Sequence, residues 1–214
     1  MKSSVKIQSR FGFYSVLTNP VKGFVETTKI LVDYGVAFVQ LRMKNVTEDE
    51  VLRVAYSMAE LTEGSSTKLI INDFPRVAKL CGAEGVHIGQ SDISYNEARE
   101  ISGKEKIIGI STHSPEQAIA ACKLNPDYIG IGPVFPTPTK QIPDPEIGIS
   151  GMKDMLACAS VPAVVIGGID LSNLHAVLEA GAENFCMVRQ FTQSDKPEEV
   201  LKEITKIYNT YYPN

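Results

Sequence analysis

Short apolar runs rich in β-branched residues alternate with longer amphipathic segments along the chain. Eight of these runs have the length and composition of buried strands, and periodic segments of ten or more residues separate them. The runs span residues 11–17, 36–41, 68–72, 85–89, 107–111, 127–132, 163–168 and 184–188. Because strands that alternate with helices are typical of a parallel sheet, eight such units predict an α/β fold, a (β/α)8 TIM barrel formed by one domain over residues 1–214.

Capping residues mark the ends of several intervening helices. Thr47 with Glu50 has the pattern of a capping box, Ser114 followed by Pro115 is typical of a helix start, and Gly181 of a helix end. The resulting predicted helices include residues 47–63, 171–180 and 196–210. An open doubly wound sheet is the alternative fold, although no G-x-G-x-x-G sequence follows the first strand.

The composition and net charge exclude some classes of protein. The 214 residues contain 21 Lys and Arg against 25 Asp and Glu, a net charge of −4, so no global positive field favours nucleic acid or an anionic membrane. The polar start and the lack of a membrane-length apolar run indicate a cytoplasmic protein, and four scattered cysteines are typical of reduced, packed thiols. The three scattered histidines argue against a zinc site. The sequence leaves the oligomeric state open and allows a homodimer.

Polar residues collect directly after the strands, where the active sites of barrels are built. Asp73 and Asp92 end the third and fourth strands, which are neighbours in a barrel, and two carboxylates there would suit a Mg²⁺ ion that also contacts phosphate oxygens. The structural alternative for either aspartate is a helix N-cap. We expect the pair, with cations opposite, to bind the metal.

Three cationic side chains accompany these carboxylates. Arg42 and Lys44 are two residues apart, so an extended chain would point both to one side, where they could clamp a diphosphate. A solvated surface pair is the alternative. Lys140 ends a loop in which three prolines alternate with Thr137 and Thr139 and restrict its backbone.

Features of the later strands are less specific. The Gly167-Gly168 pair and the last strand end at Val188 and Arg189 are typical of a barrel's phosphate cup, although a tight turn also explains two glycines. His113 is either a proton-transfer group or a hydrogen-bonded supporting residue. The other two histidines, at positions 87 and 175, are interpreted as structural or exposed.

Six ordered segments resemble thiamine phosphate synthase, also called thiamine-phosphate pyrophosphorylase, over roughly residues 36–182. They are QLRMK (40–44), IND (71–73), GVHIGQSD (85–92), GISTHS (109–114), DYIGIGPVFPTPTK (127–140) and IGGI (166–169). The resemblance implies a TIM barrel that joins hydroxymethylpyrimidine diphosphate to a thiazole phosphate, or its carboxylated form, and releases diphosphate. Its partners would be these small molecules, with Mg²⁺ as cofactor and no nucleic acid or membrane.

The resemblance also assigns roles residue by residue. It implies that Asp73 and Asp92 bind Mg²⁺, and that Thr137, Thr139, Gly168 and the backbone near Val188 hold the thiazole phosphate. It implies that the pyrimidine diphosphate is bound by Gln40, Arg42, Lys44, Asn72, Ser111 and Lys140. Of these, Arg42, Lys44, Ser111 and Lys140 would act on the leaving diphosphate as the C–O bond breaks and the thiazole nitrogen attacks. No protein nucleophile is required.

The chain departs from the family pattern at three places, one of which is the segment AENFCMV (182–188), which lacks the family's usual glycine. Asn19 stands where the family usually has Asp, and Val188-Arg189 stands where it commonly has a small residue such as Ser followed by Ala. Arg189 therefore either strengthens or fills the thiazole phosphate cup. Two alternatives stay open at this point: a thiazole tautomerase that uses His113, and a barrel that binds thiazole or thiamine phosphate without catalysis.

Overall fold

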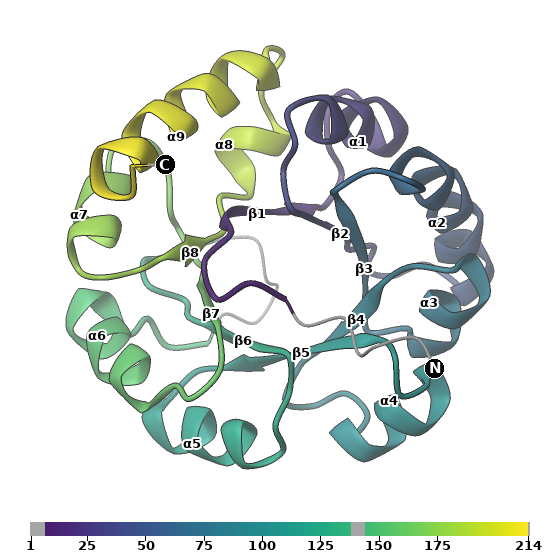
Figure 1. The fold of residues 1–214 in the computed structure, drawn as a ribbon, viewed down its shortest axis with the longest axis horizontal. Helices are drawn as coiled ribbons and strands as arrows, with labels where there is room; N and C mark the ends of the chain where they lie inside the picture. The colour runs from purple at the N-terminus through teal and green to yellow at the C-terminus, as the bar shows by residue number, and fades with distance from the viewer. Residues whose placement is uncertain (1–6, 138–143, 214) are drawn as a thin grey trace.

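The strands close into one parallel barrel. The computed structural model describes residues 7–137 and 144–213, and within them eight strands pair in the order β1-β2-β3-β4-β5-β6-β7-β8, with β8 returning to β1 (Figure 1). Every pair is parallel, and helices surround the closed sheet. The predicted (β/α)8 barrel is confirmed, and the open doubly wound sheet is wrong.

Each predicted apolar run corresponds to one strand; most strands are shorter than the run, and β5 extends one residue beyond it. The strands are β1 (Gly12–Leu17), β2 (Phe38–Leu41), β3 (Lys68–Asn72), β4 (Gly85–Ile88), β5 (Ile107–Thr112), β6 (Tyr128–Ile131), β7 (Ala163–Val165) and β8 (Asn184–Phe185). The residues that follow the strands are the polar ones noted in the sequence. They form loops at one end of the barrel, which is where a parallel sheet gathers its carboxyl ends.

The helices follow the strands in turn. Over the described residues they are α1 (Phe24–Asp33), α2 (Glu48–Thr62), α3 (Pro75–Cys81), α4 (Tyr95–Ser102), α5 (Pro115–Lys123), α6 (Gly148–Cys158), α7 (Leu174–Glu179), α8 (Arg189–Thr192) and α9 (Pro197–Tyr211). The capping box of Thr47 and Glu50 is present at α2, and the Ser114 hydroxyl accepts from the backbone N–H of Gln117 at α5. Both predicted caps are confirmed.

The predicted helix over residues 171–180 begins three residues late. The Asp170 carboxylate accepts hydrogen bonds from the backbone N–H groups of Ser172 and Asn173, and this turn replaces the first helical residues. The predicted end is correct. Gly181 has φ 98° and donates to the carbonyl of Leu178, which terminates α7 in a Schellman-type arrangement.

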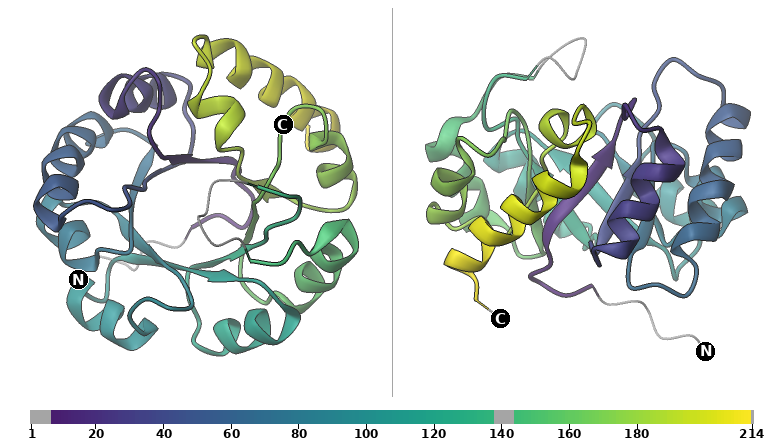
Figure 2. Two further views of the ribbon diagram at one scale, coloured as in Figure 1. Left: turned by 180° about the vertical axis from the view of Figure 1, so that it is seen from behind. Right: turned by 90° about the horizontal axis from the view of Figure 1, so that it is seen from above.

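Two apolar layers hold the barrel together. The larger one lies between the strands and the helices. The smaller one fills the barrel interior with alternate residues of the strands, because successive side chains of a strand point to opposite faces. Its buried members are Tyr14, Val16, Phe38, Ile70, Ile107, Tyr128, Val164 and Cys186. Figure 2 shows the barrel from the side, with the C-terminus at the face opposite to the ends of the strand arrows.

None of the helices within residues 7–137 and 144–213 combines the length and apolar character needed to cross a bilayer.

Asn184 completes the closure between β8 and β1. Only two residue pairs join these strands, Gly12 with Asn184 and Phe13 with Phe185. The buried Asn184 side chain adds four hydrogen bonds: its Oδ1 accepts from the N–H groups of Phe11 (2.6 Å) and Gly12 (3.1 Å), and its Nδ2 donates to the carbonyls of Ser9 (2.9 Å) and Ala163 (3.1 Å). One amide therefore substitutes for the missing ladder bonds at the base of the barrel.

The Asn184→Ala variant should lower the free energy of unfolding by about 3 kcal/mol, because it leaves several buried backbone groups without partners. Urea denaturation followed by circular dichroism measures this, with the slope against denaturant unchanged. Asn209→Ala, at an exposed position of α9, is the matched control and should change stability by less than about 0.5 kcal/mol. Equal effects of the two variants would contradict the role assigned to Asn184.

Candidate active site

A pocket of about 1270 Å³ opens at the carboxyl ends of the strands. Every predicted site residue within the described part of the chain lines it. These residues are Gln40, Arg42, Lys44, Asn72, Asp73, Asp92, Ser111, Thr137, Gly168, Val188 and Arg189. The other two, Thr139 and Lys140, lie outside the described residues. The pocket is larger than most sites for one small ligand, and its size suits two substrates together.

The end of β2 supplies a cationic side of the pocket. Arg42 continues the β2 ladder by donating its backbone N–H to the carbonyl of Leu17 at 3.0 Å. Gln40, Arg42 and Lys44 follow one another at every second position and all line the pocket, as the two-residue spacing predicted. Burial lowers the pKa of Arg42, while the nearby Asp73 carboxylate acts in the opposite direction. A solvated surface pair is therefore wrong for Arg42, which is half-buried, and Lys44 is the more exposed of the two.

Asp73 and Asp92 do not cap helices. The N-cap of α3 is Phe74, which makes no side-chain capping bond, and α4 is capped by Ser94. Asp92 instead accepts the backbone N–H of Gly89 at 2.7 Å, which orients its carboxylate within the turn after β4. Asp73 has φ 65°, a left-handed conformation at the end of β3. The helix-cap explanation is thus wrong for both aspartates.

The two carboxylates are close enough to influence each other. Burial, with a hydrogen bond and repulsion from Asp92, raises the pKa of the Asp73 carboxyl, although an ion pair with Lys44 favours its charged form. Over the described residues, the pocket is lined by four carboxylates and three cationic side chains, of which Arg189 is the third. An anionic ligand therefore needs additional positive charge, and two adjacent carboxylates are ligands that suit a hard divalent cation. No cluster of three or more potential metal ligands occurs among these residues.

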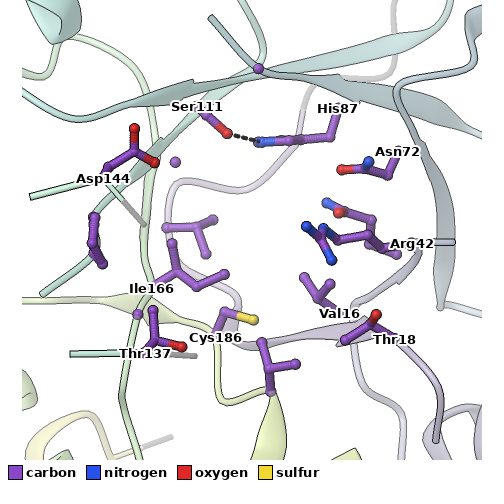
Figure 3. A pocket seen from close by; sticks show the side chains of 18 of the residues that line it. Val16, Thr18, Arg42, Asn72, His87, Ser111, Thr137, Asp144, Ile166 and Cys186 are labelled. Carbon is purple, nitrogen blue, oxygen red and sulfur yellow. Dashed lines mark hydrogen bonds between the residues drawn. The ribbon is translucent and has the colours of Figure 1, made fainter. Parts of the chain in front are cut away.

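Asn72 presents an unused donor. It is 7% exposed, and its amide Nδ2 has no hydrogen-bond partner. Its side chain points toward the pocket beside Arg42 (Figure 3). Because a buried N–H without an acceptor is costly, the arrangement favours a ligand oxygen at this place.

His87 is the site residue that the sequence interpretation missed. Its ring lines the pocket, with Nε2 2.8 Å from the Ser111 hydroxyl and Nδ1 2.9 Å from the Tyr128 hydroxyl (Figure 3). The alternation of the GVHIG run was the available signal, because Val86 and Ile88 pack outward and leave His87 facing the barrel interior. His175, by contrast, is exposed and bonded to Tyr211, as expected.

His113 is held at the side of the pocket by its neighbours. Its Nδ1 lies 2.5 Å from the carbonyl oxygen of Gly132, so Nδ1 carries the proton. Its Nε2 faces the carboxylate of Asp144 at 3.5 Å. Both ring nitrogens therefore contact protein groups, and the supporting interpretation of His113 fits better than that of a base directed at a ligand.

The glycine pair after β7 packs against the loop after β6. Gly167 and Gly168 have φ values of 106° and 63°, and a Cβ on Gly167 would lie 2.4 Å from Pro133. The loop continues the β6–β7 ladder, because the N–H groups of Val134 and Phe135 donate to the carbonyls of Ile166 and Gly167. The glycine pair and the loop after β6, which both belong to motifs of the resemblance, thus hold each other in position. The positive φ values and the close packing both require glycine at these two positions.

Arg189 is placed at the rim of the pocket. Val188 precedes the short helix α8, and Arg189 is its first residue. The Arg189 side chain is exposed and forms no ion pair with any described residue. Gln190 bonds back to the backbone N–H of Leu171 at 2.7 Å and so joins the loops after β7 and β8. The guanidinium is therefore free to contact a ligand at this side and does not fill the pocket.

Two walls of the pocket differ in character. Figure 3 shows Ser111, His87, Asn72 and Arg42 along the top and right of the pocket, the apolar side chains of Ile166 and Cys186 across from them, and Val16 below Arg42. Burial raises the pKa of the Cys186 thiol to about 12, so it is not a thiolate nucleophile near neutral pH. The pocket can bind anionic groups on one wall and the face of a flat ring on the other.

Comparison with known proteins adds an independent observation. The model of a family described as thiamine monophosphate synthase matches residues 14–191. The thiamine-phosphate synthase of Lawsonia intracellularis is 39% identical over 169 residues, which cover 79% of this chain and 78% of that protein. The thiamine-phosphate synthase of Dictyoglomus thermophilum is 38% identical over 187 residues, 87% of this chain and 84% of that protein.

Solved structures agree on the fold. The thiamine phosphate pyrophosphorylase of Pyrococcus furiosus superposes with a TM-score of 0.85 at 28% identity, covering 94% of this chain and 97% of that one. The 3-hexulose-6-phosphate synthase of Salmonella typhimurium has a TM-score of 0.70 at 12% identity, covering 94% and 100%, and shares the fold alone. The match of the family model and the identity to curated relatives confirm the resemblance seen in the motifs: the chain belongs to the thiamine monophosphate synthase family.

Proposed function

We propose that this chain joins 4-amino-5-hydroxymethyl-2-methylpyrimidine diphosphate to 4-methyl-5-(2-phosphoethyl)thiazole, or its carboxylated form, to give thiamine phosphate and diphosphate. The observation that carries the proposal is the polar wall, where Arg42, Lys44, Ser111 and the unpartnered amide of Asn72 meet in one pocket. Such a set of donors suits a diphosphate. Membership of the family supplies the identity of the two substrates.

The reaction requires one bond to break and one to form. The C–O bond of the pyrimidinylmethyl diphosphate breaks, and diphosphate leaves with the electron pair. The lone pair of the thiazole nitrogen then forms the C–N bond to the methylene carbon. Arg42, Lys44 and Ser111 would bind the leaving group and stabilise its charge, and Lys140, outside the described residues, stays a predicted member of this set.

Mg²⁺ would be held by Asp73 and Asp92. Burial, and after it the neighbouring Asp92, raises the pKa of Asp73, and a divalent cation between the two carboxylates would offset both effects. When bound, the cation supplies charge neutralisation for the leaving diphosphate. Lys44, which pairs with Asp73 here, would then share its charge with the diphosphate as well.

The second substrate would bind at the opposite side. Gly168, Val188 and Arg189 lie at the loops after β7 and β8, where barrels commonly bind phosphate groups, and Thr137 lies beside them in the β6–α6 loop. We assign the thiazole phosphate to this region, with the exposed Arg189 guanidinium as a further donor. Thr139 stays a predicted contact. The small charged substrates agree with a cytoplasmic enzyme, and both that location and a homodimer stay predictions.

The tautomerase alternative has less support. It needs a histidine directed at the ligand, and both nitrogens of His113 face Gly132 and Asp144 instead. A barrel that binds without catalysis would not need two adjacent carboxylates on the polar wall.

Purified protein mixed with Mg²⁺ and both substrates should form thiamine phosphate, measured by the fluorescence of its oxidation product. Chelation of the metal should remove the product signal. Folded protein that binds thiamine phosphate tightly under saturating Mg²⁺ but forms none would contradict the synthase and favour the binding barrel. Isomerisation of the carboxythiazole phosphate instead would favour the tautomerase.

Asp92→Asn should weaken metal binding at least about tenfold, because it removes one of two anionic ligands, and should abolish Mg²⁺-dependent turnover. Titration with Mn²⁺ followed by electron paramagnetic resonance measures the metal affinity without requiring activity. Asp73→Asn should behave in the same way, with the fold intact by circular dichroism. Asp154→Asn, on the exposed side of α6, is the control. Wild-type Mn²⁺ affinity in both site variants would refute the metal assignment.

Arg189→Ser should raise the KM for thiazole phosphate about three- to tenfold and leave the KM for pyrimidine diphosphate within about twofold, because an exposed guanidinium contributes a modest charge-assisted contact. Steady-state kinetics with each substrate varied in turn distinguishes the two. Arg53→Ser, on the outer face of α2, should leave both values unchanged. An equal rise in both KM values would remove Arg189 from the phosphate region.

A further inference from the structure

A continuous chain of hydrogen bonds crosses the barrel interior through side chains that line the pocket. The Gln40 amide Nε2 lies 3.0 Å from the Tyr14 hydroxyl, which lies 2.8 Å from the Tyr128 hydroxyl. Tyr128 in turn is 2.9 Å from Nδ1 of His87, and Nε2 of His87 is 2.8 Å from the Ser111 hydroxyl. Both ends of the chain, Gln40 and Ser111, line the pocket. Two groups of the polar wall are therefore connected through the buried phenols of Tyr14 and Tyr128 and the partly buried ring of His87.

The number of protons that each group can donate gives this chain of hydrogen bonds a direction. The Gln40 Nε2 can only donate, so the Tyr14 oxygen accepts there and its single proton goes to Tyr128. The Tyr128 proton then goes to Nδ1 of His87. A neutral imidazole with an acceptor at Nδ1 carries its proton on Nε2, and this N–H donates to Ser111. The Ser111 proton is left for the pocket.

Both phenols supply the one proton that the count requires. Tyr14 and Tyr128 are 2% and 1% exposed, and burial raises the pKa of each phenol above its ordinary value, so both stay protonated. The opposite direction would require the Gln40 amide to be turned, with its oxygen toward Tyr14. Every proton in the chain would then reverse, and the Ser111 proton would point to His87.

Two glycines of the barrel strands leave space for the side chains of Tyr128 and His87. A Cβ on Gly109 would lie 2.1 Å from the Tyr128 ring, and one on Gly130 would lie 3.4 Å from the His87 ring. Neither glycine has a positive φ, so space and not backbone conformation explains them. The rings of His87 and Tyr128 stack with their centroids 5.5 Å apart. The chain is thus packed into one geometry.

We propose that this directed chain makes His87 a positioning residue, which holds the Ser111 hydroxyl as a hydrogen-bond donor toward the leaving diphosphate. The proposal rests on the function proposed above. In this direction, the Gln40 oxygen, which has no hydrogen-bond partner among the described residues, faces the pocket as an acceptor. An aminopyrimidine diphosphate carries a donor amino group and acceptor oxygens, so one substrate complements both ends of the chain.

The reversed direction does not match this substrate. It would leave the substrate's amino group without an acceptor at Gln40, whose –NH₂ could bond only the ring nitrogens, and would turn the Ser111 lone pairs toward an anionic oxygen. The direction of the hydrogen bonds therefore contributes to recognition, because it favours a ligand with a hydrogen-bond donor at one end and an anionic group at the other. His87, Tyr128 and Tyr14 line the pocket as well, and in this role they would act through Ser111 and Gln40.

Nitrogen-15 NMR of the histidine rings in the ligand-free protein tests the direction. We expect His87 to show a protonated Nε2 and an unprotonated Nδ1, with its signals identified by their loss in His87→Asn. A protonated Nδ1 would overturn the proposal. This measurement requires no turnover, so it decides the direction of the hydrogen bonds even if the protein forms no thiamine phosphate. A protein that forms no product would refute the proposed function and the substrate assigned to the hydrogen-bond chain, but not the direction of its hydrogen bonds.

Two phenylalanine variants test the consequence for the reaction. Tyr128→Phe removes the donor to Nδ1, so it should mix the two tautomers of His87. It should also lower kcat/KM for pyrimidine diphosphate about tenfold, the equivalent of one hydrogen bond. The KM for thiazole phosphate should stay within about twofold. Tyr56→Phe, at an exposed position of α2, is the matched control, because it leaves every hydrogen bond of the chain in place. It should keep the Nε2–H tautomer and lose less than about threefold.

Equal losses in the two variants with an unchanged His87 tautomer would overturn the positioning role. A rise in the KM for both substrates in Tyr128→Phe would do the same, because a merely structural defect would affect the whole pocket.

Discussion

Closure of the parallel ladder between β8 and β1 is the constraint on which the site depends. A closed parallel sheet gathers the carboxyl ends of all its strands at one opening, so residues from distant parts of the chain meet there without local sequence signals. That closure involves only two residue pairs, and Asn184 supplements them with four side-chain hydrogen bonds at the opposite end of the barrel. The residues that stabilise the closure and the residues that line the pocket thus lie at opposite ends of the barrel.

The fold was largely predictable because its signals are local. Eight buried strands, a capping box at Thr47 and a Schellman-type end at Gly181 each follow from a few neighbouring residues. The start of α7 was not predictable at the same level, since the turn formed by the Asp170 side chain competes with the helix over three residues. The polar residues after the strands were also correctly brought together, because period-two alternation and barrel topology suffice to place Gln40, Arg42 and Lys44 on one wall.

The missed features depend on side-chain contacts between different strands and loops. His87 gains its place in the site from Tyr128 on β6 and Ser111 on β5, and nothing within its own strand predicts both partners. Gly167 and Gly168 looked like a ligand approach or a turn, and their immediate reason is the β6–α6 loop packed against them. Such pairings are set by the three-dimensional register. The helix-cap alternative for Asp73 and Asp92 was likewise settled only by the positions of the actual caps, Phe74 and Ser94.

The central claim is that the pocket has two ends, a diphosphate side at β2–β5 and a thiazole phosphate side at β7–β8. A crystal structure of the protein with thiamine phosphate, diphosphate and Mg²⁺ tests this claim most directly. The diphosphate should lie against Arg42, Lys44 and Ser111, the metal between Asp73 and Asp92, and the phosphate of the product beside Gly168 and Arg189. Diphosphate at the β7–β8 loops, or a metal that does not contact either aspartate, would contradict it.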